Sequence, residues 1–235
     1  MARVDIKRSN IRIRDGDTRT GAINNVAGYS TTTTTMLVDG LSAAIAAGRI
    51  FTLGGKRYTV VSTVGGATPT SIVIAAPGLL TSVADNAVIV VLGNELDIKV
   101  GEGTLTYGVK RNIEYMLNRG NLDAVREGDQ VPLDVAIDAT WEYITGSGAV
   151  PTIEDMLYQT GPAAAYLSTD SDACQPYCVD IEVVYDPNCP VGDTETILFP
   201  QFRYENIEHD LKAGTIKVSG KCNVIRPTAV RVAGP

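Results

Sequence analysis

The chain lacks several features on which common functions depend. Its 235 residues include one histidine, one tryptophan and three phenylalanines. A single histidine excludes a zinc site built from several imidazoles. The longest apolar runs, such as residues 72–76 and 87–92, are far too short to span a bilayer as a helix. The basic start, residues 1–8, has no apolar run behind it, so we expect no secretory signal and synthesis in a cytoplasm.

The motifs of the common enzyme classes are also missing. The chain has no phosphate-binding loop, and the Gly-Glu-Gly segment at 101–103 lacks the third glycine of a dinucleotide-binding turn. His209 stands between two acidic residues in a segment that the pattern predicts to be a turn, where a solvated side chain is the simplest interpretation. No acidic stretch has the spacing of an EF-hand loop. We therefore predict that the chain is not an enzyme, has no cofactor and carries no assignable metal site.

Charge is distributed unevenly along the chain, whose net charge is −7. Residues 1–93 hold nine Lys and Arg against five Asp and Glu, whereas residues 94–235 hold eleven against twenty-two. An acidic body has the wrong sign for gripping nucleic acid through counterion release. It suits a surface that DNA passes without binding.

Cysteines are confined to the last third of the chain, at Cys174, Cys178, Cys189 and Cys222. Their spacing lies outside the usual paired zinc patterns. Three alternatives stay open for them: disulfides formed after release from the cell, free buried thiols, and a structural metal site.

Most of the chain alternates apolar and polar residues with the period of β-strands, so the predicted fold class is mainly β. In residues 131–144 the apolar side chains share one face, and the opposite face carries Asp134, Asp138 and Glu142. This pattern predicts a half-buried strand with an acidic outer side. Residues 118–130 are polar and predict a connection between strands.

One short α-helix is predicted after Pro151. Thr152 and Asp155 have the spacing of a capping box. Ile153, Met156 and Leu157 then form an apolar stripe, and a Gly-Pro pair follows.

The N-terminal third differs from the rest in composition. Residues 17–35 are rich in Thr, Gly, Asn and Ser, which predicts a loop or linker. Residues 36–92 form a β-rich pattern, with a Gly-Gly hairpin turn at 54–55 and a helical turn at 42–47. Basic balance and glycine-rich borders mark residues 17–93 as a linker and inserted small β-rich subdomain. Residues 1–16 and 94–235 then form the main β-domain.

Two stretches resemble a known family. Residues 105–135 read LTYGVKRNIEYMLNRGNLDAVREGDQVPLDV and lead to WEYIT at 141–145; residues 195–200 read ETILFP and residues 202–223 read FRYENIEHDLKAGTIKVSGKCN. Both resemble the bacteriophage tail tube, or major tail, proteins, through polar turns as well as apolar alternation. Together they cover most of residues 94–225.

The resemblance implies a β-barrel or sandwich with a flanking helix. It implies hexameric rings that stack into a tube, with strands from six subunits lining the lumen through which DNA passes. The expected partners are further copies of the chain and the sheath, baseplate and tail terminator proteins. The expected location is the virion tail, after assembly in the host cytoplasm.

On this resemblance, the connection after residue 118 is expected to reach the neighbouring ring; its alternative is a free surface loop. The residues assigned to that contact are Arg119, Leu122, Asp123, Arg126, Glu127 and Asp129. Asp134, Asp138 and Glu142 are assigned to an acidic lumenal face that repels phosphate. Residues 17–93 depart from the family's minimal pattern, and either decorate the tube exterior, contact a sheath or enlarge the tube wall.

Two other structural roles compete with this one. The first is a monomeric or trimeric β-sandwich adhesin or decoration protein. Solubility as a monomer and a carbohydrate-binding aromatic groove would favour it, and a single tryptophan gives such a groove little support. The second is the tube protein of a phage-like contractile injection system.

Overall fold

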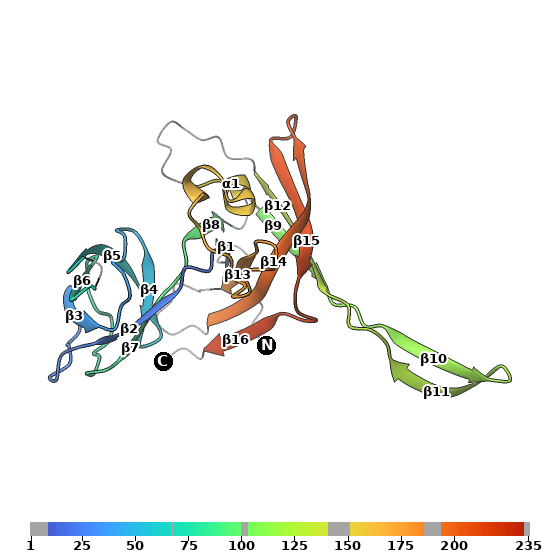
Figure 1. The fold of residues 1–235 in the computed structure, drawn as a ribbon, viewed down its shortest axis with the longest axis horizontal. Coiled ribbons are helices and arrows are strands. Elements are labelled where there is room, and N and C mark those ends of the chain that lie inside the picture. Colours follow the sequence, from blue (N-terminus) through green and yellow to red (C-terminus); the bar gives the residue numbers. More distant parts are fainter. Residues whose placement is uncertain (1–8, 67, 100–102, 141–150, 186–193, 233–235) are drawn as a thin grey trace. The chain divides into compact units, whose positions relative to one another are not determined.

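The computed structural model describes residues 9–66, 68–99, 103–140, 151–185 and 194–232. The chain is mainly β, with one short α-helix among the described residues (Figure 1). It divides into two compact units, Met1–Asp15 with Leu96–Pro235 and Gly16–Glu95. We term the first the sheet unit and the second the barrel unit. The borders predicted from the sequence, after residue 16 and before residue 94, lie within two residues of these.

Six short antiparallel strands close into a barrel in the order β2-β3-β6-β5-β4-β7. Their bounds are β2 (Arg19–Ile23), β3 (Thr35–Asp39), β4 (Ile50–Leu53), β5 (Lys56–Val64), β6 (Ser71–Ile74) and β7 (Val88–Val91). Alternate side chains point inward, and Ile23, Met36, Phe51, Ile72 and Ile89 are fully buried in one core. Closure pairs each strand on both sides, so the barrel has no edge strand.

Two expectations for this unit need correction. Residues 17–35 are not all linker, because β2 lies among them and pairs with both β3 and β7. Residues 42–47 contain no helix and follow an irregular path. In contrast, Gly54 and Gly55 form the expected tight turn between β4 and β5, with φ of 57° and 74°.

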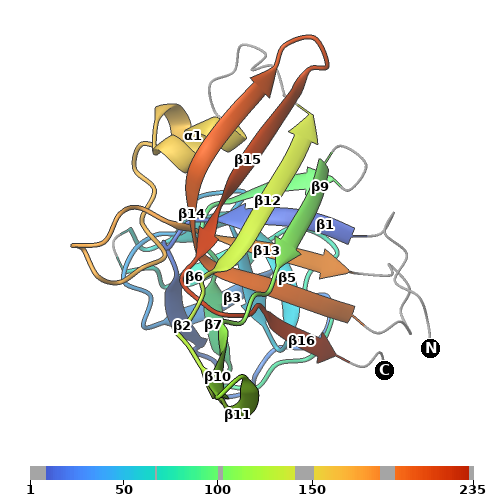
Figure 2. The same ribbon diagram turned by 90° about the vertical axis from the view of Figure 1, so that its right-hand side faces the viewer.

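The sheet unit is built on one eight-stranded sheet, in the order β8-β1-β13-β14-β15-β12-β9 with β16 paired to β14 (Figure 2). The bounds are β1 (Ser9–Arg14), β8 (Glu95–Lys99), β9 (Gly103–Gly108), β12 (Leu133–Thr140), β13 (Val179–Tyr185), β14 (Thr194–Asp210), β15 (Thr215–Cys222) and β16 (Thr228–Val232). The long strand β14 joins the two parts of the sheet. Its first half pairs with β13 and β16, and its second half pairs with β15.

One face of this sheet covers a single core. Leu133, Val135, Ile137 and Ala139 of β12 are buried while the residues between them are not, as the alternation predicts. Phe199 and Phe202 of β14 are buried in the same core.

The predicted helix is present as α1 (Ile153–Tyr158), and its apolar stripe is buried. The capping box is confirmed: Thr152 Oγ1 accepts from Asp155 N at 3.2 Å, and Asp155 Oδ2 accepts from Thr152 N at 3.0 Å. A short 3₁₀ turn, η2 (Gly161–Ala163), follows. These bonds satisfy backbone donors at the start of a helix that is too short to be stable alone.

Two strands form a sheet of their own between β9 and β12. They are β10 (Ile113–Asn118) and β11 (Asn121–Glu127), and we term them the arm hairpin (Figure 1). The expectation of a polar connection over 118–130 was therefore wrong, because β11 occupies most of it. His209 was expected in a turn and lies instead in β14, one residue before the strand ends.

Candidate assembly surface

The arm hairpin is specified locally by its turn. Arg119 and Gly120 occupy the two central positions, with φ of 49° and 85°. Two consecutive positive φ values are those of a type I′ turn, whose twist matches that of two paired strands. Glycine adopts this conformation without steric cost. Residues 118–121 therefore define a tight hairpin without help from the rest of the sheet unit.

One face of the arm hairpin is apolar. Antiparallel pairing sets Tyr115 opposite Val125 and Leu117 opposite Leu122, and strand alternation adds Ile113 to the same side. All five side chains are exposed, with 72% of Leu122 and 64% of Leu117 accessible. Burying one such side chain stabilises by about 1.5–3 kcal/mol. This face, which we term the apolar arm face, therefore favours association with a further surface.

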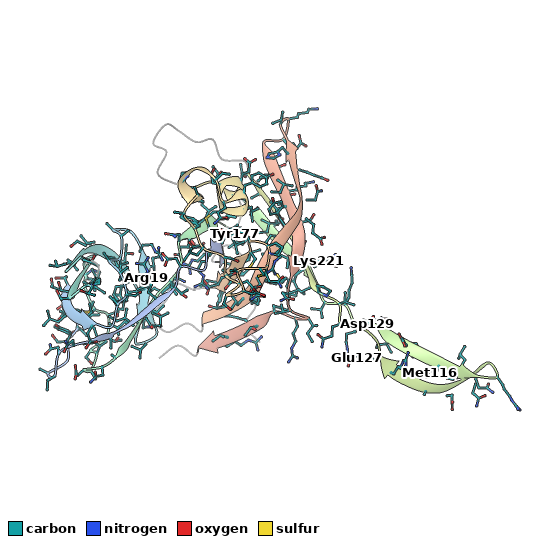
Figure 3. All side chains as sticks on the ribbon, in the orientation of Figure 1. Arg19, Met116, Glu127, Asp129, Tyr177 and Lys221 are labelled. Carbon is teal, nitrogen blue, oxygen red and sulfur yellow. The ribbon has the colours of Figure 1, made fainter. Side chains whose placement is uncertain are left out.

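The opposite face of the hairpin is mixed, with one ion pair and one apolar pair, and we term it the mixed face. Glu114 stands opposite Arg126, and Arg126 Nε lies 2.5 Å from Glu114 Oε2. Met116, labelled in Figure 3, shares this side with Ala124. Exposed ion pairs contribute at most about 1 kcal/mol, so this face gains little from a partner.

The residues expected to make the inter-ring contact all lie on or beside the arm hairpin, in different settings. Arg119 is in the turn, Leu122 is on the apolar arm face, and Arg126 pairs with Glu114 on the mixed face. Asp123 lies where the pairing register shifts, Glu127 ends β11 and pairs with Arg111 at 3.1 Å, and Asp129 follows the strand (Figure 3).

Four residues of the apolar arm face were missed by the sequence analysis: Ile113, Tyr115, Leu117 and Val125. The alternation of Ile113, Tyr115 and Leu117 is visible in the sequence. This alternation predicted a strand, but it does not reveal which surface covers the apolar side of that strand.

Two edges of the part of the main sheet formed by β14, β15, β12 and β9 are open among the described residues, in addition to the edges at β8 and β16. β9 pairs only with β12, and residues 204–210 of β14 pair only with β15. The unpaired N–H and C=O groups of an edge strand are a template for another strand. The four strands β14, β15, β12 and β9 thus form a sheet that can be extended at both sides (Figure 2).

The outer face of these four strands is polar and mixed in charge. Asp138 and Glu208 stand on either side of Lys217, and Asp134 stands opposite Lys221. A groove of about 350 Å³ is lined in part by Asp138, Glu208 and Lys217. The expected acidic face is therefore only partly acidic, because strand pairing puts lysines opposite its carboxylates. Glu142 lies outside the described residues.

Asp134 is tied to the root of the arm hairpin. Lys110 Nζ lies 2.5 Å from Asp134 Oδ2, and both side chains are largely accessible. This hydrogen bond, together with the charges of Lys110 and Lys221, lowers the pKa of the Asp134 carboxyl below its usual value.

The cysteines form no disulfide among the described residues. Cys174 is exposed, whereas Cys178 and Cys222 are buried, and all three are free. Burial, with smaller effects of Asp180 and Cys178, raises the pKa of the Cys222 thiol to about 12. Cys189 lies outside the described residues, and the described part of the chain contains no cluster of three or more metal-ligating side chains.

The barrel unit uses its cations internally. Arg49 donates to Asp17 Oδ2 at 3.0 Å and to the carbonyl oxygen of Leu92 at 2.6 Å. Arg19 also pairs with Asp17, and Arg57 pairs with Glu95 at 2.6 Å. Residues 16–95 hold four Lys and Arg and four Asp and Glu, so the basic balance assigned to the insertion belongs mostly to residues 1–15. Charge therefore does not mark the barrel unit as a binding site for an acidic partner.

Comparisons with known proteins found no matching family model, no matching curated protein and no matching solved structure. In the part of the chain that the structure describes, no helix is long and apolar enough to cross a membrane.

Proposed function

We propose that this chain is a structural subunit of a bacteriophage tail tube, which forms hexameric rings that stack into a conduit for DNA. The observation that carries the proposal is the apolar arm face. Five large side chains lie exposed on one side of a hairpin that pairs with no other described strand. An isolated two-stranded hairpin is marginal in water, so this element gains its stability when a partner covers it.

Ring formation is supported by the open edges of the four-stranded sheet. In the proposed ring, β9 of one subunit lies beside residues 204–210 of β14 in the next. Each junction satisfies backbone groups on both strands, and closing the ring removes the open edges of the four-stranded sheet. The resemblance to tail tube proteins provides the number six.

The conduit is supported by the outer face of the same strands. Asp134, Asp138 and Glu208 bring carboxylates to this face, and Glu142 continues the series in the proposal. Carboxylates repel phosphate, and each lysine of this face has a carboxylate beside it: Lys217 lies 3.9 Å from Asp138, and Lys221 lies 3.1 Å from Glu205. DNA then slides along the wall without specific binding.

The proposal includes the virion tail as the location, with sheath, baseplate and tail terminator proteins as further partners. The barrel unit is an insertion in the tube wall or on its exterior. No chemical step is assigned to the chain.

Two neighbouring residues of β10 test the proposal, because Leu117 lies on the apolar arm face and Met116 lies on the opposite, mixed face. Both side chains are exposed, so Asp at either position leaves the fold intact. We expect purified wild-type protein and Met116→Asp to form tubes, and Leu117→Asp to stop at single rings or subunits. Negative-stain electron microscopy across a concentration series measures the outcome.

Monomeric wild-type protein at every concentration, with or without a tail initiator complex, would contradict the proposal. Glycan binding by such a monomer would favour the adhesin alternative. Tubes from Leu117→Asp protein would show that the apolar arm face is not an assembly surface.

A further inference from the structure

The barrel unit carries few charged side chains. Residues 16–95 contain eight Asp, Glu, Lys and Arg among 80 residues, whereas the rest of the chain contains 39 among 155. Residues 58–84 contain none. Protein surfaces usually carry about 25–35% charged residues, and the charges of Arg19 and Arg49 are already paired with Asp17. The outside of the barrel is therefore unusually neutral.

One neutral surface lies on the outside of β3, β6 and β5. Strand pairing sets Leu37 opposite Ser71, and Ser71 opposite Val64. The pairing register of β5 shifts at Val61, which leaves this side chain exposed as well. Leu37, Val61 and Val64 are 52%, 50% and 58% exposed. We term this uncharged surface the β6 face, and it consists of Leu37, Val61, Ser62, Val64, Ser71 and Val73.

A second neutral surface lies on the outside of β2 and β7. Ala22 stands opposite Val88, and Thr20 stands opposite Val90. Val88 is 62% exposed. We term these four residues the β7 face. Its border is charged at one point, where Asp39 at the end of β3 stands opposite Ala22.

The two faces lie on opposite sides of the barrel. In the closed order β2-β3-β6-β5-β4-β7, β6 and β7 are three strands apart in either direction (Figure 1). A barrel with two such faces can contact one neighbour on each side. Contacts between unlike faces continue from copy to copy, whereas a contact between like faces stops at a pair.

A second copy of the chain is the partner that these faces fit. Each copy carries a net charge of −7, so charged surfaces of two copies tend to repel each other. Two neutral faces meet without this repulsion and without the cost of removing charges from water. Their exposed apolar side chains, such as Leu37 and Val88, gain from burial.

The size of the faces indicates that this contact acts only within a larger assembly. The β6 face spans three strands, which lie about 4.8 Å apart. This is small against the roughly 800 Å² that each partner buries in a stable interface. A small contact becomes effective when other contacts hold the copies together, as the sheet edges and the arm hairpin do in the proposed assembly.

We infer that the β6 face of one barrel unit packs against the β7 face of the barrel unit of a neighbouring copy. The inference rests on the proposed function, because it needs copies that are already held side by side. It gives the barrel unit a role of its own, which is to join neighbouring subunits.

Charged substitutions on each face test the inference. Val64→Asp changes the β6 face and Val88→Asp changes the β7 face, and both side chains are exposed, so both variants should fold. Each variant places a carboxylate in the contact, so the protein concentration at which half of the subunits assemble should rise roughly tenfold or more. Val26→Asp should leave it unchanged, because Val26 is 94% exposed and lies on neither face. Light scattering and negative-stain electron microscopy measure assembly, and circular dichroism verifies each fold.

Crosslinking distinguishes contacts between unlike faces from contacts between like faces. Val64→Cys and Val88→Cys are combined in one chain in which Cys174 and Cys189 are replaced by Ser. A bismaleimide should link the assembled double variant into a ladder of three or more subunits and should link neither single variant. The parent chain without the added cysteines controls for the two buried ones. A dimer from Val64→Cys alone, or no ladder from the assembled double variant, would overturn the inference.

The outcomes separate this inference from the proposed function. Val64→Asp and Val88→Asp proteins that assemble at the wild-type concentration would overturn the inference and leave the proposed function standing. If these assemblies then failed to bind a further tail protein, the faces would belong to that partner instead of a second copy. Wild-type protein that never assembles, with or without a tail initiator complex, would contradict the proposed function, and the inference with it.

Discussion

The barrel unit and the arm hairpin are built from the same local structures but differ in strand pairing and in the burial of their apolar side chains. Both are made of short antiparallel strands, and each contains a two-residue turn with two positive φ values. In the barrel every strand pairs on both sides, and inward side chains such as Phe51 are fully buried. In the arm hairpin each strand has one partner, and side chains such as Leu122 remain exposed.

Closure explains the difference. Six strands that pair in a ring enclose a core and satisfy their own edges, whereas two strands enclose nothing. The barrel unit therefore buries its own inward-facing apolar side chains, whereas the arm hairpin would bury its own only in the proposed assembly. Substitutions in the barrel core should change stability, and substitutions in the arm hairpin should change association.

The largest difference in stability is expected between two variants that each remove an aromatic ring, Phe51→Ala in the barrel unit and Tyr115→Ala in the arm hairpin. Phe51 is buried against Tyr58, so its truncation should lower the free energy of unfolding by about 3–5 kcal/mol. Tyr115 is exposed, and its truncation should change that free energy by less than about 0.5 kcal/mol while abolishing stacking. Urea unfolding followed by circular dichroism, with electron microscopy, measures both. Equal losses of stability would refute the contrast.

Arg49 gives the next largest effect, because it joins the two ends of the barrel unit. Besides Asp17 and the Leu92 carbonyl, it donates to Asn94 Oδ1 at 2.8 Å. Arg49→Met should cost about 2–4 kcal/mol, since it leaves the nearly buried Asp17 carboxylate without this partner.

Arg49→Lys is the control for charge alone. A lysine cannot make the forked contacts, so it should recover less than half of the loss in the same urea experiment. Full recovery by lysine would mean that charge, not the geometry of the guanidinium, joins these ends.

The sequence predicted the fold best where strand alternation and turn chemistry agree. The Gly-Gly turn at 54–55, the capping box at Thr152 and the alternating face of β12 were all predicted, because each depends on neighbours in the chain. β2 was missed, since its five residues, RTGAI, show little alternation and gain their conformation from pairing with β3 and β7. Long-range pairing of this kind leaves no local signal.

The sequence directed attention to the same segment as the structure, residues 119–129, but to different side chains on it. Polar residues such as Arg126 and Glu127 drew attention because they lie in a quoted motif, yet the structure pairs them within or at the root of the hairpin. Which side chains share a face depends on the register, and the shift at Leu117 puts Leu122 opposite it. That shift is not visible in the sequence.

A smaller change in the free energy of unfolding is expected from two matched glycines, one in a turn of the barrel unit and one in the turn of the arm hairpin. Gly55 and Gly120 have φ of 74° and 85°, and nothing lies within 4 Å of a Cβ built on either. Alanine should therefore cost about 1 kcal/mol locally at both positions. Gly55→Ala should lower the free energy of unfolding by this amount. Gly120→Ala should leave it unchanged and speed amide exchange at Met116 and Ala124 by about fivefold.

Hydrogen exchange followed by mass spectrometry, together with urea unfolding, distinguishes the two positions. A global loss of stability from Gly120→Ala would show that the arm hairpin folds as part of the sheet unit rather than as an appended element.

The smallest effect is expected at the root of the arm hairpin, where Lys110 and Asp134 form the counterpart of the Arg49 contact. Their side chains are 65% and 35% exposed, against 12% and 17% for Arg49 and Asp17. Lys110→Met should raise the pKa of Asp134 toward its usual value, because the hydrogen bond from Lys110 is the main cause of its lowering.

Solvent screening should keep Lys110→Met from changing stability measurably at neutral pH. The lowered pKa of Asp134 gives the folded state its advantage above the ordinary value of 3.8, and that advantage is lost as the pH falls through the lower folded value. Wild type and Lys110→Met should therefore differ only in the carboxyl titration of Asp134, followed by NMR. A loss of stability as large as that of Arg49→Met would mean that the hairpin is anchored to the sheet by a buried contact, and the contrast between a closed barrel and an open arm would fail at this residue.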